Sequence, residues 1–178
     1  SKAISRRQDQ LIIDALNGSS TSLSVAKTVV TTGSATASNL NVGKMIQAKK
    51  LMDAGNVPSE GRCLVIHANN VAGLLADERA ISNDFAVKAL LNGEVTAMLG
   101  FNIIIIGDRA EGGLPLSTND RTCFAFHKSA MGMAEGMGIK TEINYVPEKT
   151  SFLVNSMFSA GAVAIDDEGI VKITCDES

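Results

Sequence analysis

Aromatic residues are scarce in this 178-residue chain, which has no tryptophan, one tyrosine and six phenylalanines. So few rings argue against the base-stacking platforms of single-strand nucleic-acid binders and against aromatic sugar-binding shelves. The three cysteines, Cys63, Cys123 and Cys175, are odd in number and far apart. They therefore form neither a disulfide framework nor a zinc site, and a reducing compartment fits best.

Long apolar runs are also missing. The isoleucine run Ile103–Ile106 is four residues long, whereas a membrane-spanning helix needs about 18 consecutive apolar residues. The chain does not open with a secretory signal peptide, and it starts at Ser1 rather than at Met. We therefore expect a protein without a membrane partner, and one that is a piece of a longer chain.

The length and composition of the chain indicate one domain of ordinary size, and its charge is unevenly distributed. The apolar content of 45% is enough for a buried core, and the length fits a single domain. The net charge of −3 does not indicate a nucleic-acid-coating protein, but the first 56 residues carry +4 and the remainder −7. We expect this asymmetry to attract one end of the chain to the other end of a neighbouring copy.

Hydrophobic periodicity predicts an α+β fold, because strands and helices interleave without a regular βαβ repeat. Helices are predicted over Ser5–Leu16 (with Asn17-Gly18 as a left-handed stop), Val42–Ala54 (capped by Asn41), Asn69–Ala76, a turn at Phe85–Leu91, and His127–Gly136. Strands are predicted over Cys63–Ile66, Asn102–Ile106, Thr122–Phe126 and Lys140–Val146, while Ser151–Phe158 fits either state. Ala162–Ile165 and Ile170–Thr174 flank the turn Asp166–Gly169 and are predicted to form a closing β-hairpin.

The stretch Ser19–Ser38 is unusual, with 11 Ser/Thr in 20 residues. Alternating Leu23, Val25 and Val29 and the turn residues Thr31–Ser34 favour a surface hairpin or loop over a glycosylation or phosphorylation segment. The segment Asp77–Asp84 is polar and is predicted to be irregular.

No pattern in the sequence supports a reactive centre. His67 and His127 each end an apolar strand and lack metal-binding spacing, so capping or structural roles are favoured. Gly107–Gly113 lacks a phosphate-loop ending, and Gly132–Gly138 lies within and after a predicted helix rather than at its N-terminus, so both are interpreted as loop or packing glycines.

The remaining polar and thiol groups are interpreted in the same way. Cys63 and Cys123 are expected to be buried and inert, and Cys175 near the end to be exposed and open to reaction. Asp166–Glu168 is interpreted as a solvated turn, and Lys44, Lys49 and Lys50 as a solvated or subunit-facing stripe. We assign no catalytic, cofactor-binding or metal-binding residue, and we predict that the chain is not an enzyme.

Short segments follow one another in a familiar order over nearly the whole chain. They are Arg7–Leu16, Leu51–Asp53, Val57–Ile66, Leu74–Glu78, Ser82–Asp84, Leu91–Glu94, Leu99–Phe101, Phe126–Gly132, Gly161–Ile165 and Gly169–Ile173. None is specific alone, but their order resembles the major capsid proteins of tailed bacteriophages and, through them, the Hong Kong 97-type capsid fold.

The resemblance implies an α+β fold with a peripheral and an axial domain. It places residues 1–62, with the Ser/Thr-rich loop 19–38, in the peripheral (spine) part and residues 63–146 mostly in the axial domain. Residues 147–178 return to the peripheral domain with the closing hairpin. The N-terminal arm and the extended β-loop of family members are expected to be missing.

The resemblance also implies a function, which is that of a phage or prophage coat protein. Copies would assemble with one another in the bacterial host cytoplasm into an icosahedral virion shell, with scaffold and portal proteins as further partners. The shell would enclose DNA without sequence-specific contacts. Without the arm and loop, we expect this chain to be a monomer or a small oligomer.

Two alternatives remain open. An encapsulin-like compartment protein shares the fold, although the sequence carries no trace of a groove for a cargo peptide. A small-molecule-binding α/β enzyme domain would place its site among Gly107–Gly113, His67 and His127.

Overall fold

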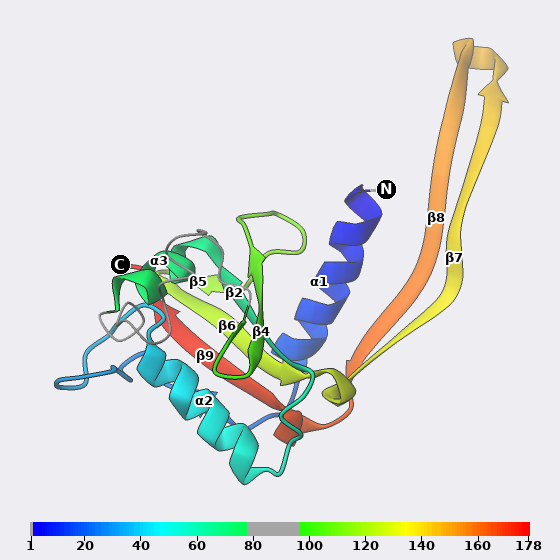
Figure 1. Cartoon of the computed structure of the whole chain (residues 1–178). Coiled ribbons are helices and arrows are strands. Elements are labelled where there is room, and N and C mark those ends of the chain that lie inside the picture. The colour runs from blue at the N-terminus through cyan, green and yellow to red at the C-terminus, as the bar shows by residue number, and fades with distance from the viewer. Residues whose placement is uncertain (1, 78–96) are drawn as a thin grey trace.

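The computed structural model describes residues 2–77 and 97–178, which form a mixed sheet with helices and one long projecting hairpin (Figure 1). The helices are α1 (Lys2–Gly18), α2 (Val42–Ala54) and α3 (Ala68–Ala76), with 3₁₀ turns η1 (Lys128–Ala130), η2 (Pro147–Lys149) and η3 (Asp167–Gly169). The strands are β1 (Ser24–Val25), β2 (Arg62–His67), β3 (Ala97–Met98), β4 (Phe101–Ile106), β5 (Leu116–Ser117), β6 (Asp120–His127), β7 (Met131–Val146), β8 (Ser151–Ala164) and β9 (Ile170–Asp176). The helical turn predicted at Phe85–Leu91 lies outside the described residues, as does the polar segment after Asp77.

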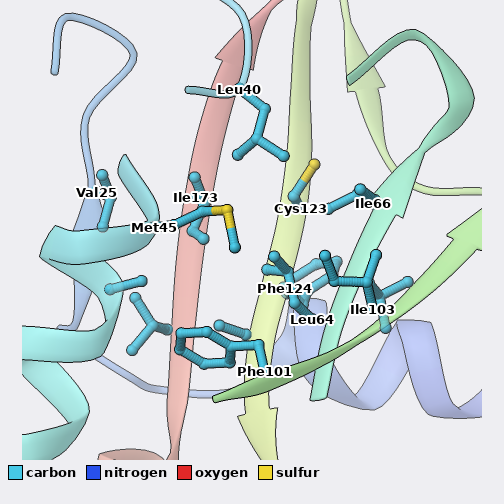
Figure 2. Close-up of a cluster of buried hydrophobic side chains, with 14 of the residues drawn as sticks. Val25, Leu40, Met45, Leu64, Ile66, Phe101, Ile103, Cys123, Phe124 and Ile173 are labelled. Carbon is cyan, nitrogen blue, oxygen red and sulfur yellow. The ribbon is translucent and has the colours of Figure 1, made fainter. Parts of the chain in front are cut away.

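The main sheet has the strand order β1-β9-β6-β2-β4-β3, with β5 paired to β6. β1 runs parallel to β9 and β2 parallel to β4, while the other pairs are antiparallel. Every residue of β2 is buried, as expected for a strand covered on both faces. The core in Figure 2 gathers side chains from α2, the segment before it and the sheet: Val25, Leu40, Met45, Leu64, Ile66, Phe101, Ile103, Cys123, Phe124 and Ile173.

Three of the predicted helices, Ser5–Leu16, Val42–Ala54 and Asn69–Ala76, are confirmed, as are the buried strands, with small differences at their ends. Asn41 caps α2, because its side-chain oxygen accepts a hydrogen bond from the Lys44 backbone nitrogen at 2.9 Å. Gly18, at the end of α1, does not adopt the left-handed conformation that the sequence predicted. Instead, the Lys172 ammonium donates to the carbonyl oxygens of Asn17 and Ser19 at 2.9 and 3.0 Å and satisfies that helix end.

The helix predicted over His127–Gly136 is wrong. Only the turn η1 is helical there, and the chain continues as β7, which pairs with β8 from Met131↔Ala164 to Val146↔Ser151. Several glycines in this stretch disfavour a helix, and the long-range pairing decides the outcome. Ser151–Phe158, which fitted either state, is part of β8.

The predicted closing hairpin is also wrong. β8 and β9 follow each other around the expected turn, but β8 pairs with β7, whereas β9 lies between β1 and β6. The turn η3 is stabilised locally, because Asp166 Oδ1 accepts a hydrogen bond from the Glu168 backbone nitrogen at 3.0 Å. The chain therefore moves from one sheet to the other across η3.

The structure decides between the hairpin and the loop predicted for the Ser/Thr-rich stretch and corrects the interpretation of Lys44. The stretch is a loop rather than a hairpin, because its only strand, β1, pairs with the distant β9, and Thr31–Ser34 are bends. Lys44 is not solvated but fully buried, and its Nζ donates to the carbonyl oxygens of Ser38 and of Thr174, the latter at 3.1 Å. Lys50 remains exposed, and Lys49 is half-buried with an ion pair to Asp53 at 3.5 Å.

Burial of Lys44 predicts a pH dependence of stability. Loss of hydration lowers the pKa of its ammonium below the ordinary 10.5. The unfolded chain then binds more protons than the folded chain between the two pKa values, so the free energy of unfolding rises with pH in that window. In urea titrations from about pH 8 to about pH 10, we expect wild type to gain stability relative to Lys44→Met. Lys50→Met, an exposed control on the same helix, should follow wild type, and a Lys44→Met profile parallel to wild type would contradict the prediction.

Candidate interaction surface

The hairpin formed by β7 and β8 projects from the main sheet (Figure 1) and carries most of the exposed large apolar side chains among the described residues. Its strands are 16 and 14 residues long and are joined by η2, after which Thr150 adopts a left-handed conformation at φ 49°. Two irregularities, between Glu135 and Met137 and between Met137 and Lys140, interrupt the pairing on the β7 side. The half of the hairpin between these irregularities and η2 is called the distal half here.

The half near the body is covered on one face by α1. Ala160, Ala162 and Ala164 are partly buried on this face, while Gly161 and Val163 between them are exposed. Glu135, opposite Ala160, accepts a hydrogen bond from Gln8 of α1 at 2.9 Å. The small alanine side chains let the helix lie close to the strand.

The distal half has one apolar face, made by Ile143, Tyr145, Phe152 and Val154, which we call the distal face. Ile143 is opposite Val154 and Tyr145 is opposite Phe152, so the four side chains project from the same side of the ribbon. The two rings have centroids 5.3 Å apart and are inclined at 58°. Ile143, Val154 and Phe152 are 67%, 62% and 70% exposed and Tyr145 is 53% exposed.

The opposite side of the distal half is mostly polar. It carries Lys140 and Glu142, which form an ion pair at 2.7 Å, together with Asn144 and Asn155. Leu153 is the exposed apolar residue on this side, at 54%. The distal half is therefore amphipathic across its two faces, which is the pattern of a strand pair with one covered face.

Exposed apolar faces of this kind are typical of surfaces that contact other proteins. Two strands alone are only marginally stable in water unless another element covers an apolar face. The signal for this surface was present in the sequence, as alternation at Ile143, Tyr145, Phe152 and Val154. It was missed because alternation by itself does not show which strand pairs with which.

The two histidines do not come together in the structure. β2 and β6 are antiparallel with Arg62 opposite His127, so His127 and His67 are near opposite ends of β2, about 17 Å apart along the strand. Each has the capping role expected: His67 Nδ1 accepts from the Asn69 nitrogen and His127 Nδ1 from the Ser129 nitrogen, both at 3.2 Å. The enzyme alternative needed both imidazoles beside Gly107–Gly113, and this arrangement is not formed.

Gly107–Gly113 is a packing loop on α1, as interpreted. Gly112 has φ +79°, and a Cβ there would be 3.0 Å from the Arg6 carbonyl oxygen. Its nitrogen donates to Gln10 Oε1 at 2.6 Å, and Arg109 pairs with Asp9 at 3.3 Å. The loop therefore fixes the position of α1 rather than binding a phosphate.

The cysteines and the acidic turn are placed as expected with one exception. Cys63 and Cys123 are buried, and Asp166–Glu168 are exposed. Cys175 is buried rather than exposed. A hydrogen bond from Cys123 and the charge of buried Lys44 hold the pKa of the Cys175 thiol below its ordinary value. Sequence spacing did not reveal Lys44 as a neighbour, because β9 is brought beside α2 only in the fold.

The basic excess of the first 56 residues is partly neutralised within the chain. Arg7 pairs with Glu111 at 3.5 Å and Lys27 with Asp120 at 2.9 Å. Lys49 pairs with Asp53, and Lys44 is buried. Fewer of these charges are therefore available to contact a neighbouring copy than the sequence suggested.

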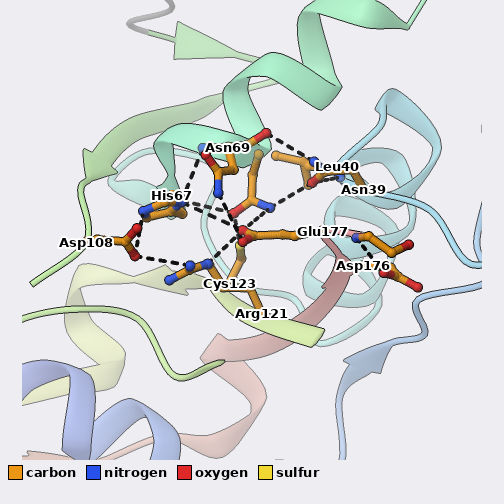
Figure 3. Close-up of polar contacts among 11 residues, drawn as sticks. Asn39, Leu40, His67, Asn69, Asp108, Arg121, Cys123, Asp176 and Glu177 are labelled. Carbon is orange, nitrogen blue, oxygen red and sulfur yellow. Dashed lines mark hydrogen bonds and ion pairs between the residues drawn. The ribbon is translucent and has the colours of Figure 1, made fainter. Parts of the chain in front are cut away.

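A polar cluster that includes the buried His67, Asn70 and Arg121 joins the chain end to the main sheet (Figure 3). The Glu177 carboxylate accepts hydrogen bonds from Arg121 Nε at 2.7 Å and from the side-chain nitrogens of Asn69 and Asn70, each at 3.2 Å. Asp108 Oδ1 lies 3.2 Å from both Arg121 Nη2 and His67 Nε2. The cluster spans β2, α3, β6 and the loop after β4, and sequence analysis identified only His67 in it.

These groups are joined to one another by hydrogen bonds and ion pairs, as expected for a structural cluster. Within residues 2–77 and 97–178, no group of three His, Cys, Asp or Glu is arranged to hold a metal ion. No helix in the described part of the chain is long and apolar enough to cross a membrane.

We predict that Glu177→Gln lowers the free energy of unfolding by about 1–3 kcal/mol, because it weakens the charge-assisted bonds to buried Arg121. Urea denaturation at neutral pH measures the change. Glu168→Gln replaces an exposed carboxylate near the same chain end and should alter stability by no more than about 0.5 kcal/mol. Equal effects of the two substitutions would contradict the structural role of the cluster.

Comparison with known proteins gives a consistent result. The model of the family described as phage capsid protein matches residues 1–177. The solved structure described as Mycobacterium phage Che8 has a TM-score of 0.71 at 21% identity, covering 97% of this chain and 59% of that chain. The head structure of Helicobacter pylori bacteriophage KHP40 has a TM-score of 0.72 at 12% identity, covering 99% and 67%.

An encapsulin is also similar in structure. The holo-SrpI encapsulin complex from Synechococcus elongatus has a TM-score of 0.58 at 14% identity, covering 99% of this chain and 63% of that chain. No curated protein sequence matches the chain. The fold is therefore the Hong Kong 97-type capsid fold that the sequence predicted, and the chain spans about three fifths to two thirds of the length of these relatives.

Proposed function

This chain belongs to the phage capsid protein family, and we propose that it is part of a major capsid protein of a tailed phage or prophage. Copies assemble with one another in the bacterial cytoplasm into the icosahedral shell that encloses the genome. The observation that carries the proposal is the family match over residues 1–177, combined with a capsid fold over nearly the whole chain.

The surface chemistry supports a structural role. Most of the exposed large apolar side chains in the described residues lie on the projecting hairpin, as expected for a protein that contacts other proteins. The buried polar groups around Glu177 are used for internal hydrogen bonds. We therefore propose that the chain has no catalytic activity and binds no cofactor.

We propose that the main sheet corresponds to the axial domain and that α1 with β7 and β8 belongs to the peripheral domain. Pairing of Tyr145 with Phe152 supports keeping the two strands in one domain, whereas the boundary expected between residues 146 and 147 divides the hairpin. Scaffold and portal proteins are proposed partners. The net charge of −3 suits a shell that encloses DNA without reading its sequence.

The particles of the source cells test this proposal. After prophage induction or phage infection, lysate is separated on a density gradient, and fractions with nuclease-resistant DNA are analysed by mass spectrometry. We expect peptides of this chain to be the most abundant in that fraction. An uninduced culture is the control.

Two outcomes would contradict the proposal. Absence of the chain from every particle fraction would remove the structural role. Presence only in shells that hold protein cargo and no DNA would establish the encapsulin-like alternative, which the weaker similarity to the Synechococcus complex leaves as second candidate.

A further inference from the structure

We propose that His67 is a proton-operated switch at the start of α3: its neutral imidazole caps the helix, and its protonated imidazole binds the Glu177 carboxylate at the chain end instead. The proposal goes beyond the proposed function and does not depend on it, because every contact involved lies within one chain. His67 ends β2 and is only 3% exposed. Its ring is therefore surrounded by groups of the protein, which Figure 3 shows.

The neutral ring has one satisfied nitrogen and one that is poorly satisfied. Nδ1 accepts a hydrogen bond from the Asn69 backbone nitrogen at 3.2 Å, so the proton of the neutral imidazole is on Nε2. Nε2 lies 3.2 Å from Asp108 Oδ1, but no acceptor within residues 2–77 and 97–178 is aligned to take a hydrogen bond from it. A buried N–H group without an aligned acceptor is unfavourable.

The charges around the ring favour a cation at this position. The charged and titratable groups there are Asp108 from the loop after β4, Arg121 and Cys123 from β6, and Glu177 at the chain end. From α3, the side chains that contact these groups are the neutral amides of Asn69 and Asn70. Two carboxylates and one guanidinium leave one negative charge in excess, which a proton on the imidazole balances.

Protonation exchanges one partner of Nδ1 for another. A proton taken from solvent by Nδ1 removes the acceptor of the Asn69 backbone nitrogen. The new N–H group has Glu177 Oε1 at 3.7 Å from Nδ1, and a movement of about 1 Å brings the two atoms to the distance of a charge-assisted hydrogen bond. Asn69 also donates from its side chain to Glu177 Oε2 at 3.2 Å. The first turn of α3 and the chain end therefore respond together.

The change is confined to these two segments. The His67 backbone nitrogen donates to Asn70 Oδ1 at 3.1 Å, and Asn70 Nδ2 donates to Asn39 Oδ1 at 2.7 Å. Neither bond uses the imidazole, so both persist when the ring is protonated. α3 thus stays attached to the end of β2 in both states, and the switch alters local contacts without unfolding the helix.

The second histidine has the same cap without the second partner. His127 Nδ1 accepts from the Ser129 backbone nitrogen at 3.2 Å, and its Nε2 has the Glu60 carbonyl oxygen as acceptor at 2.7 Å. The contacts of this ring within the described residues include no carboxylate comparable to Glu177. His127 therefore serves as a matched control for His67.

Nuclear magnetic resonance of the isotope-labelled chain between about pH 7.5 and about pH 5 tests the proposal. Imidazoles change charge in this range, whereas unperturbed carboxylates do so near pH 4. In wild type we expect both ring nitrogens of His67 to be protonated at the acidic end. The hydrogen-exchange protection of the Asn69 amide, corrected for the intrinsic effect of pH, should fall about fivefold or more with the same midpoint, because one capping hydrogen bond is lost.

Three variants separate the steps. His67→Asn supplies a cap that does not titrate, so Asn69 protection should become independent of pH. His127→Asn should leave the wild-type response at Asn69 unchanged. Glu177→Gln removes the carboxylate that stabilises the imidazolium, so the midpoint for His67 should move to lower pH.

Four results would overturn the proposal. They are a His67 ring that stays neutral over the whole range, an Asn69 amide that does not respond while His67 titrates, a pH response at Asn69 that survives in His67→Asn, and an unchanged midpoint in Glu177→Gln. The particle analysis depends on none of these results, so failure here leaves the capsid assignment standing.

Discussion

The structure depends on one crossing, where the chain leaves the main sheet and returns to it. β6 and β9 are paired as far as Phe126↔Ile170, and pairing resumes at Met131↔Ala164 in the hairpin. Between them, the backbone nitrogens of Ile165 and Asp166 donate to the Ala130 carbonyl oxygen at 2.8 and 3.3 Å. Gly169 is buried there, and a Cβ on it would be only 2.6 Å from that of Ala130. One antiparallel ribbon thus runs from the core into solvent.

The side chains on the two sides of this crossing differ strongly in their exposure to solvent. In the body, Cys123, Phe124, Val171 and Ile173 are fully buried between helices and neighbouring strands. In the distal half, apolar residues of similar size are mostly exposed. In the described part of the chain, β7 and β8 form a sheet of two strands, and the apolar face of the distal half is exposed. The same alternation therefore produces buried side chains in one half of the ribbon and exposed side chains in the other.

Helix α1 links the hairpin to the body through polar contacts. Lys172 binds the end of the helix, the loop at Arg109 and Gly112 binds its outer side, and Gln8 contacts Glu135 on β7. These contacts set the angle of the hairpin relative to the sheet. The glycine-rich loop Gly107–Gly113 and Lys172 thus hold α1 in place.

The sequence alone determined the local structure: three helices with their apolar stripes, the Asn41 cap, the buried strands at Cys63–Ile66 and Thr122–Phe126, and the capping roles of the two histidines. The order of its segments also indicated the family and the fold. These features depend on neighbours within a few residues or on a pattern along the chain, so they can be predicted from the sequence without knowledge of long-range contacts. Tertiary structure alone decided that Lys44 and Cys175 are buried, that Glu177 contacts Arg121, and that Ala162–Ala164 pairs with β7 instead of β9. Each of these results brings together residues far apart in the chain, and the free energy that selects among such pairings comes from burial and hydrogen bonding that no local pattern encodes.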